Sequence, residues 1–153
     1  MVLSSYAKIN LSLTVNSSQK NNLHEIQSYF CLINLTDKIK LKKIKEKKDK
    51  ISFKGPFAKL VNKSNNSVIN LIKMLRRSGL ISDYYSVTVF KNIPVFAGLG
   101  GGTGNAAVIL KHLCKEKMNK KLLNKVEKTV GSDLRLFFYN QGFLKNLQTI
   151  MDF

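Results

Sequence analysis

The sequence predicts an α+β fold, because strands gather in the first third of the chain and helices alternate with strands after it. Residues 7–15 alternate between apolar and polar side chains, a pattern typical of a strand with one face on a core. Farther along, a glycine-rich segment separates an expected strand from an expected helix. With 153 residues, the chain has the length of one ordinary domain.

The remaining elements follow from periodicity and turn residues. Strands are expected at 7–15, 25–35, 37–44, 51–53, 84–90 and 134–139, with a polar turn over 16–22. Asn65 or Asn66 caps a helix that Gly79 ends, and its apolar stripe is Val68, Leu71, Ile72 and Leu75. A second helix follows the glycine-rich segment, and a third is expected over 121–130.

The composition limits the choice of partners. A net charge of +17 is compatible with a nucleic-acid-binding protein, but nearly all of it is lysine without regular aromatic interleaving. A solvated lysine surface or attraction of anionic substrates explains the charge as well, so nucleic acid is not the favoured partner. No apolar run approaches the roughly 20 residues of a membrane helix. Cys31 and Cys114 lack metal-ligand spacing, and we expect a reduced, cytoplasmic compartment.

The glycine-rich segment predicts a phosphate site. Five of the nine glycines lie within residues 98–104, directly before an apolar helical pattern. A loop of this kind directs backbone N–H groups and the positive end of the helix dipole at one spot. It is not a P-loop, because the next lysine is Lys111, and Thr103 stands where the dinucleotide fingerprint needs glycine. The alternative is a tight or flexible turn without a ligand.

Residues 94–107 resemble the nucleotide loop of the kinases that include galactokinase, homoserine kinase and mevalonate kinase. Three glycines before a small hydroxyl residue and Asn-Ala-Ala are similar to the 4-diphosphocytidyl-2-C-methyl-D-erythritol kinases of the non-mevalonate isoprenoid (terpenoid) pathway. The resemblance implies ATP binding, with Mg²⁺ carried by the nucleotide and no metal site on the protein itself. The implied nucleotide-binding residues are Pro94, Val95, Phe96, Ala97, Gly98, Leu99, Gly100, Gly101, Gly102, Thr103 and Gly104.

Three further residues or segments extend the resemblance. Lys8 and Asn10 share the polar face of the first strand, and residues 6–11 are similar to the family's opening motif, whose lysine is catalytic. Residues 131–138 resemble the segment that carries its catalytic aspartate, here Asp133. Residues 23–30 resemble the cytosine-binding segment, which makes His24 a substrate-binding residue, together with Asn10. Taken alone, each of these residues would more often be an ordinary surface or turn residue.

The sequence departs from the family pattern at four positions. Tyr6 and Arg135 stand where the family has proline, and Leu23 replaces the tyrosine beside the histidine. Gly104 replaces the second of two serines in the loop. Leu23 has no aromatic face for stacking on cytosine, Gly104 removes a hydroxyl, and Arg135 adds a charge near Asp133.

The resemblance implies the N-terminal domain of this kinase type, a ribosomal protein S5 domain 2-like fold. Family members are about twice as long, so we expect an N-terminal half whose C-terminal domain is absent. Residues 1–141 are the expected ATP-binding domain, and 142–153 a tail where the second domain would begin. The implied activity is ATP-dependent phosphorylation of the 2-hydroxyl of 4-diphosphocytidyl-2-C-methyl-D-erythritol, with self-association or a partner chain replacing the absent half. The alternatives are a non-catalytic remnant and a basic nucleic-acid-binding domain.

Overall fold

The computed structural model describes residues 1–16, 25–145 and 149–151, and the strands in them form one seven-stranded sheet. The strands are β1 (Val2–Asn10), β2 (Thr14–Asn16), β3 (Glu25–Ile44), β4 (Lys50–Lys54), β5 (Tyr84–Phe90), β6 (Gln141–Lys145) and β7 (Thr149–Met151). The α-helices are α1 (Ser67–Arg77), α2 (Gly101–Cys114) and α3 (Lys120–Val130), and the 3₁₀ helices are η1 (Ala58–Leu60), η2 (Lys115–Lys117) and η3 (Ser132–Phe138). This mixed architecture agrees with the predicted α+β class.

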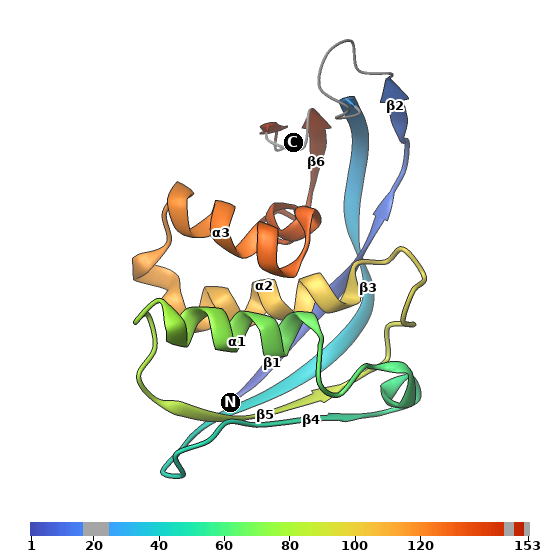
Figure 1. The fold of residues 1–153 in the computed structure, drawn as a ribbon. Coiled ribbons are helices and arrows are strands. Elements are labelled where there is room, and N and C mark those ends of the chain that lie inside the picture. The colour runs from blue at the N-terminus through green and yellow to red at the C-terminus, as the bar shows by residue number, and fades with distance from the viewer. Residues whose placement is uncertain (17–24, 146–148, 152–153) are drawn as a thin grey trace.

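The long strand β3 organises the sheet (Figure 1). β1 and β2 pair with one edge of β3, while β5 and β6 pair with different parts of its other edge, all antiparallel. β4 runs parallel to β5 at the end of the sheet, and β7 pairs with β6. The first strand, β1, and the late strand β6 therefore both lie beside β3, which brings residues from the two ends of the described chain close together.

Helices α1 and α2 lie on one face of the sheet, and α3 stacks beyond them (Figure 1). The main core lies between these layers, since apolar residues of β3 and β5 alternate toward the helices. Fully buried members of this core include Ile39, Val87, Val89, Leu71, Leu75, Ile109 and Leu110. In the described part of the chain, no helix has the length and apolarity needed to cross a membrane.

The predicted helix boundaries are largely confirmed. The side chain of Asn66 accepts a hydrogen bond of 3.0 Å from the backbone N of Ile69, which caps α1 as expected. The helix ends just before Gly79, which has a φ of 68°. The third helix begins at Lys120, where Asn119 caps it by accepting from Leu122 N at 2.9 Å.

The predicted first strand is wrong in its extent. β1 begins at Val2 and ends at Asn10, and the expected core residues Leu11 and Leu13 are 66% and 57% exposed. The register against β3 shifts between Tyr6 and Ala7, and such bulges change the direction of nearby side chains. Beyond the shift Lys8 is only 5% exposed, instead of lying on a solvated face.

Two other predictions need correction. Residues 25–35 and 37–44 form the single strand β3, because nothing in 35–37 breaks the extended backbone. Residues 134–139 do not form a strand: most of them lie in η3, whose side chains Leu134, Leu136 and Phe137 are buried. The next strand, β6, begins at Gln141 and pairs with β3, so residues 142–145 belong to the same sheet. The turn expected over 16–22 falls largely outside the described residues.

Candidate active site

The glycine-rich loop leads from β5 into the first turn of α2. Gly98 and Gly100 have φ angles of 72° and 67°, which side-chain-bearing residues rarely adopt. At Gly100 a Cβ would also lie 2.5 Å from Phe137 Cζ, so glycine is required there for space as well. Because α2 begins at Gly101, the loop leaves the first N–H groups of the helix directed at one place, as an anion site requires.

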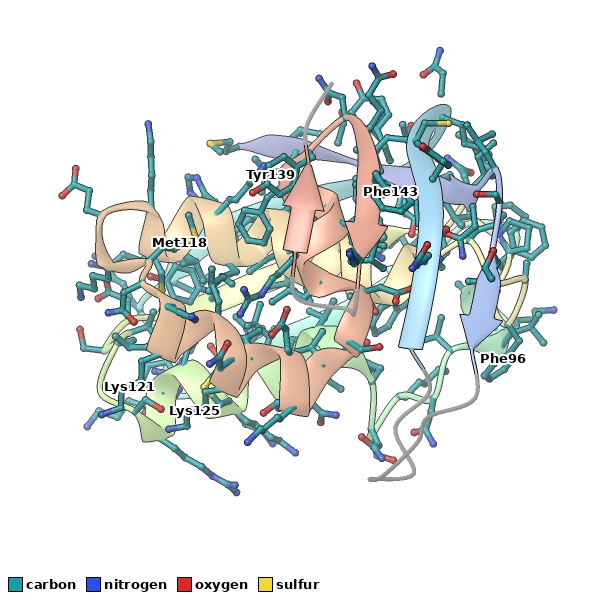
Figure 2. All side chains as sticks on the ribbon, turned by 90° about the horizontal axis from the view of Figure 1, so that it is seen from above. Phe96, Met118, Lys121, Lys125, Tyr139 and Phe143 are labelled. Atoms are coloured by element: carbon teal, nitrogen blue, oxygen red, sulfur yellow. The ribbon has the colours of Figure 1, made fainter. Side chains whose placement is uncertain are left out.

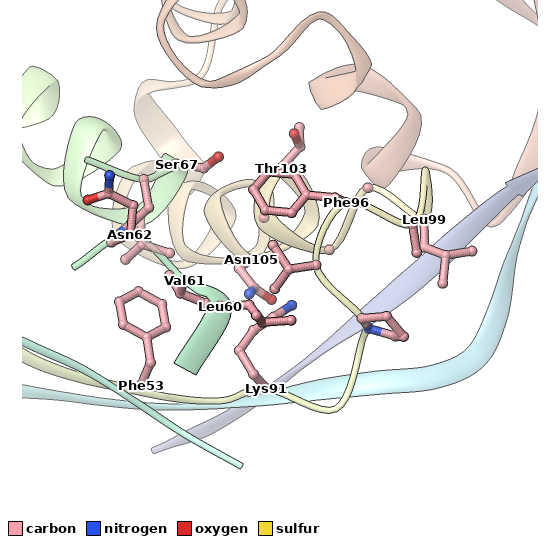
Figure 3. Close-up of a pocket in the computed structure, with 18 of the residues that line it drawn as sticks. Phe53, Leu60, Val61, Asn62, Ser67, Lys91, Phe96, Leu99, Thr103 and Asn105 are labelled. Atoms are coloured by element: carbon pink, nitrogen blue, oxygen red, sulfur yellow. The ribbon is translucent and has the colours of Figure 1, made fainter. Parts of the chain in front are cut away.

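The loop forms one side of a cavity of about 340 Å³ (Figure 3). Apolar side chains of Phe53, Leu60 and Val61 line another part of the cavity, and Asn62 and Ser67 add polar groups. The lining contains all the predicted nucleotide-binding residues except Gly104: Pro94, Val95, Phe96, Ala97, Gly98, Leu99, Gly100, Gly101, Gly102 and Thr103. An apolar wall facing the N-terminal end of α2 fits a ligand with a flat base and an anionic end.

A buried carboxylate that sequence reasoning missed fixes one wall of this cavity. Asp37, fully buried on β3, accepts hydrogen bonds of 2.8 Å from the backbone N atoms of both Asn92 and Ile93. Its other oxygen lies 2.6 Å from Lys91 Nζ and 2.9 Å from Asn105 Nδ2. These four contacts connect β3, the start of the loop and α2, so they hold the loop in register with the helix. Lys91 and Asn105 both line the cavity.

The sequence contains a signal for this network. Asp37 occupies the same alternating phase as the core residues Ile39 and Leu41, and Lys91 continues the phase of Val87 and Val89. A charged side chain in the buried phase of a strand needs a partner. Two such residues on strands that pair with each other would have pointed to this ion pair.

The predicted catalytic residues lie together on the other side of the loop. Lys8 Nζ is 3.1 Å from Asp133 Oδ2 and donates a 3.1 Å hydrogen bond to Asn10 Oδ1. The Lys8 side chain is 7% exposed, while that of Asp133 is 36% exposed. The backbone N of Lys8 donates to Leu99 O at 3.0 Å, which joins β1 to the loop. A buried ammonium group is thus held beside a carboxylate that solvent reaches.

Thr103 connects the loop to the segment of Asp133. A Cβ on Gly131 would lie 2.8 Å from Thr103 Oγ1, so the hydroxyl packs directly against the backbone just before η3. The Thr103 hydroxyl and the Asp133 carboxylate offer oxygen ligands, the type of ligand that Mg²⁺ prefers. The described residues contain no group of three or more His, Cys, Asp and Glu side chains placed to hold a metal ion.

The departures at Gly104 and Arg135 have structural reasons. A Cβ on Gly104 would lie 2.9 Å from Phe137 Cε1, so the ring of Phe137 occupies the space that a side chain at 104 would need. Arg135 lies against α3, where its Nε donates to Glu127 Oε1 at 2.6 Å and its Nη2 donates to Asn124 Oδ1. The guanidinium charge is therefore paired with a carboxylate of α3. His24 and Leu23 lie outside the described residues.

Comparison with known proteins identifies a matching domain family. Residues 66–140 match the model of the GHMP kinases N terminal domain. A 4-diphosphocytidyl-2-C-methyl-D-erythritol kinase from Pelagibacter ubique is 38% identical over 138 residues, covering 88% of this chain and 48% of the relative. The kinase of the same name from Ureaplasma parvum is 29% identical over 167 residues, covering 99% and 59%. The chain spans about half the length of the curated relatives it matches.

Solved structures share the fold. A crystal structure of 4-(cytidine 5'-diphospho)-2C-methyl-D-erythritol kinase matches with a TM-score of 0.73 and 23% identity, over 100% of this chain and 55% of that one. Mevalonate kinase from Methanococcus jannaschii matches with a TM-score of 0.60 and 17% identity, again over 100% and 55%. The family model, the curated relatives and the shared fold agree with one another. Over residues 66–140 the chain carries the N-terminal domain of the GHMP kinase family, and it shares the fold of that family.

Proposed function

We propose that this chain serves ATP-dependent phosphorylation of the 2-hydroxyl of 4-diphosphocytidyl-2-C-methyl-D-erythritol. The observation that carries the proposal is the Lys8–Asp133 pair, 3.1 Å apart and joined to the glycine-rich loop through Leu99. The names of the curated relatives support this choice of substrate. They do not favour the alternative of a basic nucleic-acid-binding domain.

The geometry gives each group a role in transfer. The N–H groups at the start of α2 hold the phosphates of ATP, while Lys8 neutralises charge on the transferred phosphoryl group. Asp133, reached by solvent and held by Lys8, accepts the proton of the donor hydroxyl. Mg²⁺ bound with the nucleotide would neutralise phosphate charge, and the side-chain oxygen atoms of Thr103 and Asp133 would be available to hold it. Asn10 orients the Lys8 ammonium group.

We propose that His24 and Asn10 bind the cytidyl end of the substrate. A neutral imidazole has one donor and one acceptor nitrogen, which suits the hydrogen-bonding edge of cytosine. Asn10 is exposed at the end of β1, on the same strand as Lys8. A His24→Ala variant should therefore raise the KM for the cytidyl substrate and leave the KM for ATP unchanged.

The proposal includes the rest of the substrate site. Because the relatives are about twice as long as the matched region, we assign residues 1–141 to the ATP-binding domain and propose that further chain closes the site. A second copy or a partner chain would fill this role for the 153-residue chain. We also assign the activity to the cytoplasm, where the free thiols Cys31 and Cys114 stay reduced.

The test is ADP release from Mg²⁺-ATP by the purified chain, with and without the cytidyl substrate. Release that depends on the substrate and is lost in Asp133→Ala supports the proposal. Asp83→Ala is the matched control, since Asp83 pairs with the exposed Lys43 away from the loop. Substrate-dependent release that Asp133→Ala leaves unchanged would contradict the role of Asp133. Absence of release at any protein concentration, with ATP still bound, would favour a non-catalytic domain.

A further inference from the structure

Phe96 combines two unfavourable features at the tip of the glycine-rich loop. Its φ is 64°, and among the described residues it is the one non-glycine residue with a positive φ. Its side chain is also 95% exposed, more than any other large hydrophobic residue that the structure describes. A bulky residue in the left-handed region is strained, and a bare aromatic ring gains nothing from burial. Such features persist at functional sites, where a ligand offsets them.

The ring of Phe96 lies at the cavity and not on a remote surface. Phe96 lines the cavity of about 340 Å³ together with Leu60, which is 58% exposed. Figure 3 shows the two side chains arriving from different segments, Phe96 from the loop and Leu60 from η1. Figure 2 shows Phe96 at the opposite end of the molecule from Lys121 and Lys125 of α3. Two exposed apolar side chains therefore line a single cavity.

A buried polar atom in the same cavity wall also lacks a partner. The side chain of Asn105 donates through Nδ2 to Asp37, an acceptor, which fixes its amide orientation. Its Oδ1 is buried and has no hydrogen-bond partner within the described residues. A buried acceptor without a partner is uncommon in native proteins, and such groups often occur at functional sites.

We propose that the Phe96 ring stacks on the base of the bound nucleotide, with Leu60 and the apolar wall on the base's other side. Every base has a π face, and stacking on an aromatic side chain strengthens binding without reading sequence. This inference rests on the proposed function, because it takes the nucleotide to be the ligand of this cavity. The inference assigns Phe96 to the base of the nucleotide, whereas the glycines of the loop bind its phosphates. Strain at Phe96 is then the consequence of directing its ring over the cavity.

The test separates the ring from the backbone. Calorimetric titration of the 153-residue chain with ATP and with inorganic tripolyphosphate is compared for wild type, Phe96→Ala, Phe96→Gly and Phe96→Tyr. Both small variants should bind ATP about five- to a hundredfold more weakly and keep the wild-type affinity for tripolyphosphate. Phe96→Tyr should bind ATP like the wild type, because it keeps an aromatic face.

The melting temperatures of the Phe96 variants should rank differently from their affinities for ATP. Phe96→Gly should melt at a higher temperature than Phe96→Ala, because glycine removes the strain of the positive φ and alanine does not. If Phe96 served only the fold, its variants would change the melting temperature but not the affinity for ATP. The matched control is Phe90→Ala, on an exposed ring of β5 outside the cavity lining, which should leave both affinities unchanged.

The outcomes are distinct. If the wild type binds both ligands, and Phe96→Gly and Phe96→Ala bind ATP as tightly as the wild type does, the stacking role is overturned. The kinase proposal then stays in place. Equal losses for ATP and tripolyphosphate would also overturn it, since the ring would then act through the loop and not on the base. A wild-type chain that binds neither ligand would overturn the nucleotide site itself, and the stacking role with it.

Discussion

Two lysine–aspartate pairs flank the glycine-rich loop, and they differ in what surrounds them. The Lys91–Asp37 pair is 2.6 Å long, and its side chains are 4% and 0% exposed. The Lys8–Asp133 pair is 3.1 Å long, and its aspartate is 36% exposed. Asp37 accepts from four donors, whereas Lys8 is the single polar partner of the Asp133 carboxylate among the described residues.

This difference distinguishes a pair that supports the fold from a pair whose carboxylate is free to contact a substrate. A carboxylate whose lone pairs are all engaged at full burial holds backbone elements together and has nothing left for a substrate. A carboxylate with one partner and access to solvent can still accept a proton. The same two residue types therefore give a structural connection on one side of the loop and, on the other, the pair to which we assign the proposed phosphoryl transfer.

The largest effect should come from Asp133→Asn. The amide keeps the shape but cannot accept the hydroxyl proton, so phosphoryl transfer should fall about 10²- to 10⁴-fold. Stability should change by no more than about 1 kcal/mol, because this pair is partly exposed and Asn10 still accepts from Lys8. Steady-state kinetics and urea unfolding measure the two quantities. A stability loss as large as the catalytic loss would contradict the division between the two pairs.

The next largest effect should come from Asp37→Asn. The substitution leaves the Lys91 ammonium group buried without a countercharge, which should lower the free energy of unfolding by about 3–5 kcal/mol. Asp49→Asn is the matched control, because Asp49 also holds an arginine, Arg76, and the backbone N of Tyr85, but its side chain is 17% exposed. Urea unfolding should show a smaller loss there. The double variant Asp37→Asn/Lys91→Met should recover part of the stability, and no recovery would argue against the charge explanation.

A third prediction concerns the contact between the loop and the reactive pair. In Gly100→Ala the new Cβ would lie 2.5 Å from Phe137 Cζ and 3.2 Å from Lys8 Cγ, at a φ of 67°. Unfolding free energy should fall by about 2–4 kcal/mol from strain and crowding together, and transfer should fall with it as Lys8 moves. Gly79→Ala shares the strain, with a φ of 68°, but has no atom within 4 Å. Equal losses at both positions would mean that crowding at Lys8 plays no part.

The sequence pointed to both residues of the Lys8–Asp133 pair, which the structure brings together, but not to the Asp37–Lys91 pair. Lys8 and Asp133 were found because the segments around them resemble a known family, and the glycine-rich loop because glycine clusters have a direct backbone meaning. The Asp37 network went unpredicted, although both charged residues continue the buried phase of their strands. Alternation was instead read as a core face over 7–15, where β1 ends at Asn10 and pairing with β3 resumes only at Thr14.

Tertiary context decided the remaining differences. The apolar pattern of 134–139 suits a strand by composition, but the residues wind into η3 and bury Leu134 and Phe137 against the helices. The burial of Lys8 depends on the loop at Gly100 and on Asp133, which lie beside it only in the folded chain, and no local pattern in β1 reveals them. The strain at Phe96 likewise depends on the path of the loop and not on its composition.

The smallest predicted effect concerns a lysine with no carboxylate partner in the described structure. Lys111 donates to Phe137 O at 3.4 Å and lies 4.8 Å from the centre of the Phe138 ring. Burial lowers the pKa of Lys111 from its ordinary value of 10.5. Between the lowered pKa and 10.5 the unfolded chain binds more protons than the folded one, so this lysine makes stability rise with pH across that window. Below the window its unfavourable contribution is complete.

Lys111→Met should therefore remove that rise and make the protein slightly more stable at neutral pH, by less than about 1 kcal/mol because the group is partly exposed. Urea unfolding of both proteins from pH 7 to pH 11 measures the difference. Lys121→Met, on an exposed residue of α3, is the control and should leave the pH profile unchanged. A stability curve that still rises in Lys111→Met would assign the pH dependence to another group. The rise in the wild type and its loss in the variant would show that the partial burial of Lys111, which has no carboxylate partner among the described residues, lowers the stability of the fold at neutral pH.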